Sequence, residues 1–152
     1  MMDKTAQAMK IAPLANQPQR VTTPVYGHTN PTEQQKVANP VKCYAEAIEL
    51  RPEMEQEYRR LHANVWPEVV AAIKKANIRN FKIYLTEIEG KKYLVKFFEY
   101  TGDDAQKDFA SIAEDPTTRT QWWPLTDACQ KQLAGTPEGE QWKPIEMIMH
   151  LP

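Results

Sequence analysis

The chain has 152 residues, 41% of them apolar and 26% charged, which is the composition of one soluble globular domain. Its formal net charge of −1 gives no general attraction for nucleic acid or an anionic membrane surface. No apolar run approaches the roughly 18 residues of a membrane-spanning helix, and the N-terminal residues lack the apolar segment of a secretory signal. Cys43 and Cys129 lie far apart in no metal-binding spacing, so we expect free thiols and a cytoplasmic protein.

Residues 1–40 differ in composition from the rest of the chain. They contain five of the twelve prolines, and Tyr26 is their single aromatic residue. Four basic residues oppose two acidic ones, which gives a charge of +2 here and leaves −3 for residues 41–152. This composition predicts a Pro-rich extension at residues 1–40, either flexible or lying along a partner subunit, followed by a folded domain at residues 41–152.

The folded domain is predicted to begin with a strand and an interrupted helix. Residues 42–50 form the strand, and Pro52 lies near the first turn of the helix, where proline is tolerated. Apolar residues then recur at spacings of four, three and four, as on one face of a helix: Met54, Tyr58, Leu61 and Val65. Pro67 interrupts this helix, which is expected to resume until about Asn77.

Residues 78–100 are predicted to form two antiparallel strands. Glu89 and Gly90 mark the turn between them, and the second strand ends near Tyr100. Each strand has an alternating apolar set, made of Phe81, Ile83 and Leu85 on the first and of Tyr93, Val95 and Phe97 on the second. Alternation of this kind is typical of a strand with one buried face.

Two helical segments follow the hairpin, and each has a start signal. Thr101 and Asp104 have the T-x-x-D spacing of a capping box, which predicts a helix beginning after Thr101. Asp115 is followed by proline, the combination of a cap and a first helical residue. The second helix contains Trp122-Trp123-Pro124, so its middle is expected to be bent or broken.

The end of the chain is predicted to contain the rest of this helix and a last strand. An apolar stripe continues through Cys129 and Leu133, and Gly135 is a plausible helix cap. Residues 142–151 alternate apolar and other side chains, which predicts the final strand.

The predicted element order is β-α-β-β-α-β, with the second helical region split in two. This is the ferredoxin-like α+β arrangement, an antiparallel sheet with helices on one face. The other face of the sheet also carries apolar residues, including Tyr84. Pairing of two such sheets in a homodimer would cover both of them, so we expect a dimeric α+β barrel.

His62 is the best candidate for a residue that transfers protons. Tyr58 precedes it by four residues, so the imidazole and the phenol share one helix face. The alternative is a helix that packs on a sheet with a satisfied histidine at its end. His28 lies in the Pro-rich extension, and His150 lies near the C-terminus, where it is either a surface or a site residue. No metal-binding, nucleotide-binding or nucleophile motif is present, so we expect no metal and no cofactor.

Trp122 and Trp123 form the other unusual feature. Adjacent residues of a helix point about 100° apart, so both indoles cannot belong to one apolar stripe. One can pack in the core while the other lines a cavity, where indole suits the C–H faces of a sugar. Core packing of both is the alternative.

These features together resemble the L-rhamnose mutarotase family across residues 41–152. The residues that carry the resemblance are Tyr58-x-Arg60-x-His62, Trp66-Pro67-Glu68, Asn80-Phe81-Lys82-Ile83-Tyr84-Leu85, Gln121-Trp122-Trp123, Thr126-Asp127 and His150-Leu151-Pro152. The resemblance implies a dimeric α+β barrel that interconverts the α and β anomers of L-rhamnose without a cofactor. It further implies that His62 is the proton donor and that Tyr58, Trp122 and Trp123 contact the sugar.

The chain departs from the family at Phe81, where the family usually has a sugar-binding tyrosine. Loss of that hydroxyl removes a hydrogen bond worth about 0.5–1.5 kcal/mol, so the preferred deoxysugar stays open. The base for the anomeric proton is not identified, with Tyr58 and a water as the alternatives. A rival function is that of a cofactor-independent oxygenase or a non-catalytic binder of small ligands, since the fold alone does not separate these classes.

Overall fold

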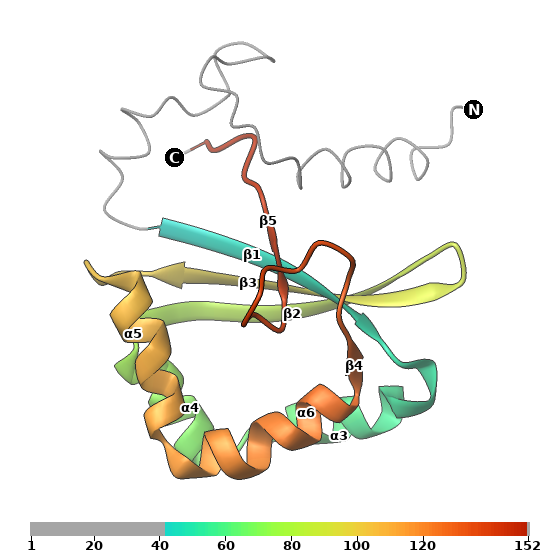
Figure 1. Ribbon diagram of the computed structural model, residues 1–152, viewed down its shortest axis with the longest axis horizontal. Helices are drawn as coiled ribbons and strands as arrows, with labels where there is room; N and C mark the ends of the chain where they lie inside the picture. Colours follow the sequence, from blue (N-terminus) through green and yellow to red (C-terminus); the bar gives the residue numbers. More distant parts are fainter. Residues whose placement is uncertain (1–41, 152) are drawn as a thin grey trace.

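One antiparallel sheet with helices on a single face forms the protein in the computed structural model, which describes residues 42–151 (Figure 1). Among these residues, no helix has the length and apolar character to cross a membrane. The predicted extension at residues 1–40, with His28, lies outside the described residues. The helices and strands, in chain order, are β1 (Lys42–Leu50), α3 (Glu55–Ala63), α4 (Pro67–Lys75), β2 (Ile78–Ile88), β3 (Lys91–Tyr100), α5 (Ala105–Ser111), α6 (Trp123–Ala128), β4 (Gln130–Lys131) and β5 (Lys143–Ile145).

The strands follow the order β2-β3-β1-β4, and β5 also pairs with β1. The short strands β4 and β5 take successive parts of one β1 edge, with Leu50 opposite Gln130 and Ala45 opposite Ile145. All of these pairings are antiparallel. This order confirms the predicted α+β class and ferredoxin-like sheet.

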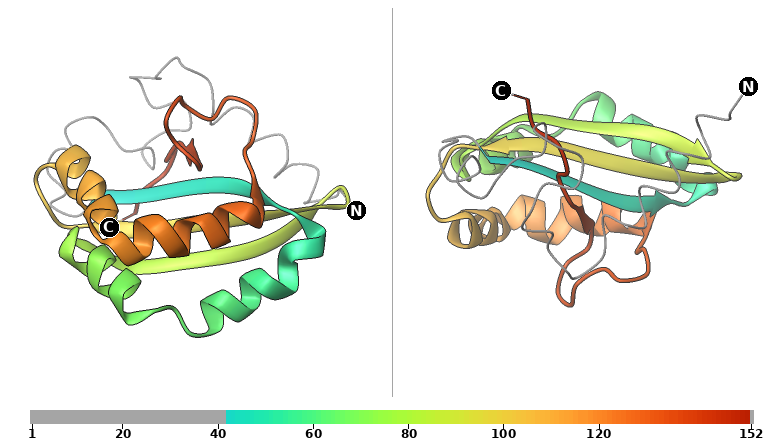
Figure 2. Two further views of the ribbon diagram at one scale, coloured as in Figure 1. Left: turned by 60° about the horizontal axis from the view of Figure 1, so that its bottom comes forward. Right: turned by 90° about the horizontal axis from the view of Figure 1, so that it is seen from above.

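The core lies between the sheet and the helices, and the two views in Figure 2 show the helices confined to that side. It consists of three apolar clusters: Ile48, Leu50, Tyr58, Leu94 and Cys129 in the first, Leu61, Val69 and Trp122 in the second, and Ala76, Ile78 and Phe98 in the third. Full burial of an aliphatic side chain of this kind contributes about 1.5–3 kcal/mol to folding.

The opposite face of the sheet is covered by no helix of residues 42–151. Tyr84 on this face is 57% exposed, and its neighbours across the sheet are Val95 and then Ala47. An apolar surface of this kind is typical of an interface. The homodimer predicted from the sequence stays a prediction.

Two of the predicted turn and helix-start signals are confirmed, and one is wrong. Glu89 and Gly90 join β2 to β3 with positive φ angles of 51° and 77°. Asp115 caps the second helical region, accepting the Thr118 backbone N–H at 2.7 Å. The predicted capping box at Thr101 is wrong. Asp104 is the N-cap of α5, and the Thr101 backbone N–H donates to Asn77 O instead.

The bend predicted at Trp122-Trp123-Pro124 takes the form of a π-helical turn at Thr118–Trp122, after which α6 continues the helix. A π turn adds one residue to a helical turn and rotates the side chains that follow it. The helix ends at Ala128, so its predicted continuation through Leu133 to Gly135 is wrong. Sheet pairing ends it, since Cys129 O accepts the Arg51 backbone N–H and Gln130 joins β1.

The predicted final strand at residues 142–151 is too long. Only Lys143–Ile145 pair with β1, and the chain then leaves its edge (Figure 1). An alternating pattern favours extended backbone, but a strand also needs pairing along a neighbouring strand, and the ladder with β1 ends at Ile145.

Candidate active site

Helix α3 holds His62 in its last turn, directly above Tyr58. The His62 Nδ1 atom lies 2.9 Å from the Tyr58 carbonyl oxygen. The two rings stack with their centroids 4.1 Å apart and their planes 25° apart. A carbonyl oxygen only accepts hydrogen bonds, so Nδ1 carries the proton of the neutral ring and Nε2 is its unprotonated nitrogen. Pro67 starts α4 shortly afterwards, which keeps His62 at a helix end.

Burial sets the ionisation of both residues. It lowers the pKa of His62, and the hydrogen bond to the Tyr58 carbonyl opposes this effect in part. Burial also raises the pKa of the Tyr58 phenol, against the opposing effect of a hydrogen bond with the Gln130 side chain. Tyr58 is therefore a neutral hydrogen-bonding group at physiological pH.

The tryptophan pair comes from the π-helical turn and the first residue of α6. Trp122 is 5% exposed and packs edge-on against His62 and Trp66, with ring centroids 5.2 Å away in each case. Trp123 is half-buried and packs at the border of the same cluster. The two indoles therefore have different environments, one in the core and one at its edge.

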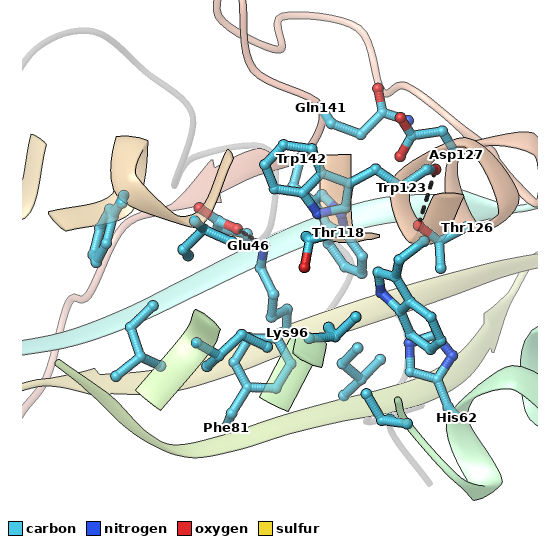
Figure 3. Close-up of a pocket in the computed structure, with 18 of the residues that line it drawn as sticks. Glu46, His62, Phe81, Lys96, Thr118, Trp123, Thr126, Asp127, Gln141 and Trp142 are labelled. Carbon is cyan, nitrogen blue, oxygen red and sulfur yellow. Dashed lines mark hydrogen bonds and ion pairs between the residues drawn. The ribbon is translucent and has the colours of Figure 1, made fainter. Parts of the chain in front are cut away.

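A cavity of about 1140 Å³ lies between the sheet and the helices. It is larger than the roughly 300–1,000 Å³ of most small-ligand pockets. All four predicted site residues line this cavity, namely Tyr58, His62, Trp122 and Trp123. Phe81 lines it as well. Figure 3 shows His62 at one end and Phe81 near the strands. The sequence therefore identified residues that share one cavity.

Phe81 owes its position to an irregularity in β2. The pairing of β2 with β3 shifts between Arg79 and Lys82, and Asn80 has a positive φ of 48°. A β-bulge of this kind re-aims the side chain beside it. Phe81 stacks on Phe98 at 5.9 Å and stays 40% exposed.

Several polar residues of the cavity were not predicted as site residues. Glu46 and Lys96 form an ion pair on its sheet side, and Asp127, Gln130 and Trp142 also line it. Burial raises the pKa of the Asp127 carboxyl. The sequence did contain one signal for Lys96. It is a charged residue on the strand face that also carries the buried apolar residues Leu94 and Phe98, each two positions away.

His150 lies outside the cavity. His150 is half-exposed beyond β5 and is not among the residues that line the cavity. Within residues 42–151, no group of three or more His, Cys, Asp or Glu side chains has a metal-binding arrangement.

Comparison with known proteins gives the family. Residues 43–151 match the family model of L-rhamnose mutarotase. The chain belongs to the L-rhamnose mutarotase family. An L-rhamnose mutarotase of Brucella anthropi is 27% identical to it over 109 residues, which cover 72% of this chain and 95% of the relative. A UPF0734 protein of Dictyostelium discoideum is 31% identical over 116 residues, covering 72% of this chain and 90% of that protein.

A solved mutarotase structure supports the fold assignment. The crystal structure of an L-rhamnose mutarotase from Formosa agariphila matches with a TM-score of 0.50 and 18% identity. The match covers 73% of this chain and 99% of that one. Membership in the mutarotase family supports an isomerase of the epimerase type, at the level of the family.

Proposed function

We propose that the protein interconverts the α and β anomers of L-rhamnose, or of a related deoxyhexose, by general acid–base catalysis without a cofactor. The observation that carries this proposal is the fixed His62 ring. Its Nδ1 proton is bound by the Tyr58 carbonyl, so Nε2 serves a ligand in a cavity that Trp122 and Trp123 also line. In a cytoplasmic homodimer, each subunit would carry one such cavity.

Mutarotation requires a proton on the ring oxygen and the loss of a proton from the anomeric hydroxyl. His62 acts in its imidazolium form, which its lowered pKa makes a stronger acid, and donates from Nε2 to the ring oxygen. The bond between the ring oxygen and the anomeric carbon then breaks, and the anomeric oxygen becomes a carbonyl as its proton leaves. The carbonyl turns over and the reverse transfers close the ring on its other face, so protons are conserved and no covalent intermediate with the protein is needed.

The electrostatics of the cavity disfavour Tyr58 as the base for the anomeric proton. Its pKa is raised, so the phenol keeps its proton and acts as a hydrogen-bond donor to the sugar. Asp127 is a better candidate, because it lines the cavity; the residue is exposed as a whole, but partial burial of its carboxyl raises the pKa and makes the carboxylate more basic. A water molecule is the alternative acceptor.

The required acceleration is modest, since sugars mutarotate spontaneously. Positioned acid and base groups typically contribute about 10²–10⁴-fold. The mixed lining of indole, imidazole, carboxylate and amide groups also suits a polyhydroxylated ring better than the planar aromatic substrate of a cofactor-independent oxygenase.

Exchange NMR on the anomers of L-rhamnose tests this function. We expect the protein to accelerate exchange, His62→Ala to lose at least about 10²-fold of that acceleration, and His150→Ala to keep it. Unchanged exchange with His62→Ala would contradict the role of His62. Binding of deoxyhexoses without any acceleration by the unmodified protein would support the non-catalytic alternative.

A further inference from the structure

The sheet forms one wall of the cavity, called here its floor, and this floor carries a pair of opposite charges. Glu46 of β1 lies opposite Lys96 of β3, and Lys96 lies opposite Ile83 of β2. These three residues form one row across the sheet on the side that faces the helices. Figure 3 shows the Lys96 side chain extending along the sheet toward Glu46, with Trp142 near both.

This pair is partly buried and incompletely hydrogen-bonded. The Lys96 side chain is 17% exposed and that of Glu46 is 21% exposed. Lys96 Nζ forms an ion pair with Glu46 Oε2 and lies 4.6 Å from the centre of the Trp142 ring. The Oε2 atom is buried and its contact with Lys96 lacks hydrogen-bond geometry, so it has no hydrogen-bond partner among residues 42–151. A carboxylate accepts about four hydrogen bonds and an ammonium donates three, which leaves capacity for a ligand.

Folding alone gives little reason for such a pair. Removing two charges from water costs several kcal/mol per ion, and a well-packed apolar pair of similar size is often neutral or stabilising instead. Buried polar atoms are normally hydrogen-bonded, and Glu46 Oε2 has its ion pair with Lys96 but no hydrogen bond, so it can still accept one from a ligand. The partner expected from this chemistry is a hydroxyl group, which donates to Glu46 and accepts from Lys96.

The charge balance of the cavity indicates a neutral ligand. Its lining contains three carboxylates, Glu46, Asp127 and Glu140, and three cations, Lys74, Arg79 and Lys96. Lys96 is neutralised by Glu46, and Arg79 is paired with Glu99. At this pair a sugar phosphate or a uronate would find no cation that lacks a counter-charge, and the third cation, Lys74, lies on α4. Neighbouring hydroxyls of a neutral sugar match the pair.

The pair and His62 line the same cavity at different places (Figure 3). Leu94 packs in one cluster with Tyr58, the residue beneath His62, and Lys96 is two residues further along β3. Two residues of a strand span about 6.6–6.8 Å. A sugar with its anomeric carbon at His62 would therefore meet the pair, if at all, through hydroxyls away from that carbon.

We propose that Glu46 and Lys96 form a subsite that binds neighbouring ring hydroxyls of a neutral sugar, away from the anomeric carbon, and so determines which sugars the enzyme accepts. This inference rests on the proposed mutarotase function and extends it to substrate selection. A site built to hydrogen-bond a hydroxyl strongly rejects an analogue that lacks it, because its own polar groups are then left unpaired.

The test compares the unmodified protein with Glu46→Leu/Lys96→Met in exchange NMR. L-rhamnose and its 2-, 3- and 4-deoxy analogues serve as substrates. We expect the variant to fold, KM for L-rhamnose to rise roughly tenfold to a hundredfold, as expected for lost hydrogen bonds to charged groups, and kcat to change much less. The unmodified protein should reject at least one analogue that the variant no longer distinguishes from L-rhamnose.

The matched control is Glu55→Leu/Lys92→Met. It removes a second partly buried ion pair that involves β3 but lies outside the cavity. An unchanged KM and unchanged analogue preference in the Glu46/Lys96 variant would overturn the subsite, as would the same change in the control variant. Saturation-transfer NMR on the same samples measures sugar binding alone. If the unmodified protein binds L-rhamnose without accelerating exchange, the mutarotase function fails, while weaker binding by the variant still supports the subsite.

Discussion

His62 stacks on Tyr58 with ring centroids 4.1 Å apart and donates from Nδ1 to the carbonyl oxygen of the same residue. One helical turn thus fixes both the orientation of the imidazole and the nitrogen that keeps its proton. Nε2 is the other nitrogen of this ring, which lines the cavity. This arrangement makes the behaviour of His62 measurable by pH as well as by substitution.

Stability should fall as the pH drops below about 6.5, the ordinary pKa of histidine. Burial lowers the pKa of His62 in the folded protein, so between the two pKa values the unfolded chain binds more protons. The contribution of neutral His62 is complete above the unfolded pKa and is lost as the pH falls through the folded one. We expect a shallower fall of Tm over this range in His62→Asn, whose amide offers an N–H near the Nδ1 position. Thermal unfolding that depends equally on pH in both proteins would contradict this.

The two tryptophans should respond differently to truncation. Trp122 is 5% exposed, and Trp122→Ala should lower the free energy of unfolding by about 3–5 kcal/mol. Trp123→Ala should cost less stability but raise KM roughly tenfold, because one aromatic contact with the sugar is lost. Denaturant unfolding and exchange NMR measure the two effects. Equal losses of stability would refute the division of roles.

Phe81→Tyr should improve sugar binding. The bulge places Phe81 in the cavity wall with 40% of its side chain exposed, so an added hydroxyl meets space. One hydrogen bond of about 0.5–1.5 kcal/mol corresponds to a fall in KM of roughly twofold to tenfold. Phe81→Leu is the control without a hydroxyl. A KM that does not fall in the tyrosine variant would show that this position makes no polar contact with the sugar.

Tyr100→Phe should destabilise the end of the cavity near α5. The Tyr100 hydroxyl donates to Asp108 Oδ2 at 2.6 Å, and Asn77 Nδ2 donates to the same oxygen at 2.9 Å. Burial and this carboxylate raise the pKa of Tyr100 to about 12. We expect Tm to fall by roughly 4–8 °C, the shift for about one lost hydrogen bond in a small domain. A Tm equal to that of the unmodified protein would show that the bond is not stabilising.

Tyr84→Asp should convert the expected homodimer into monomers. Tyr84 lies on the sheet face that no helix of residues 42–151 covers, and it is 57% exposed, so the fold of the subunit should tolerate the change. A buried carboxylate at an interface lacks a partner and opposes association. Light scattering gives the mass of the variant and of the unmodified protein. A monomeric unmodified protein would rule out the dimer.

The sequence predicted the parts of the fold that local patterns determine. Period-two alternation and the Glu89-Gly90 turn gave the two long strands, and the i, i+4 relation placed Tyr58 beneath His62. The end of α6 at Ala128 was not predictable in this way, since it depends on Arg51 and Leu50, which are far away in the sequence. Long-range pairing overrides a local apolar stripe.

The difference between local patterns and long-range pairing also explains which site residues could be predicted. His62, Tyr58 and the tryptophans were identified from spacing and from family resemblance. Glu46 and Lys96 were not, because their encounter depends on the register between β1 and β3. The alternation of Tyr93, Val95 and Phe97 predicted the wrong buried face, because residues 91–100 carry apolar side chains on both faces and the helices cover Leu94, Phe98 and Tyr100.

The β-bulge between Arg79 and Lys82 has a consequence for how this enzyme can change. Phe81 stands outside the regular ladder, has no directly opposite residue, and rests its ring on Phe98 while its other side stays exposed. A substitution there alters the cavity wall while the hydrogen bonds of β2 and β3 persist. Under the proposed function, we therefore expect substitutions at this position to change the preferred sugar with little loss of stability.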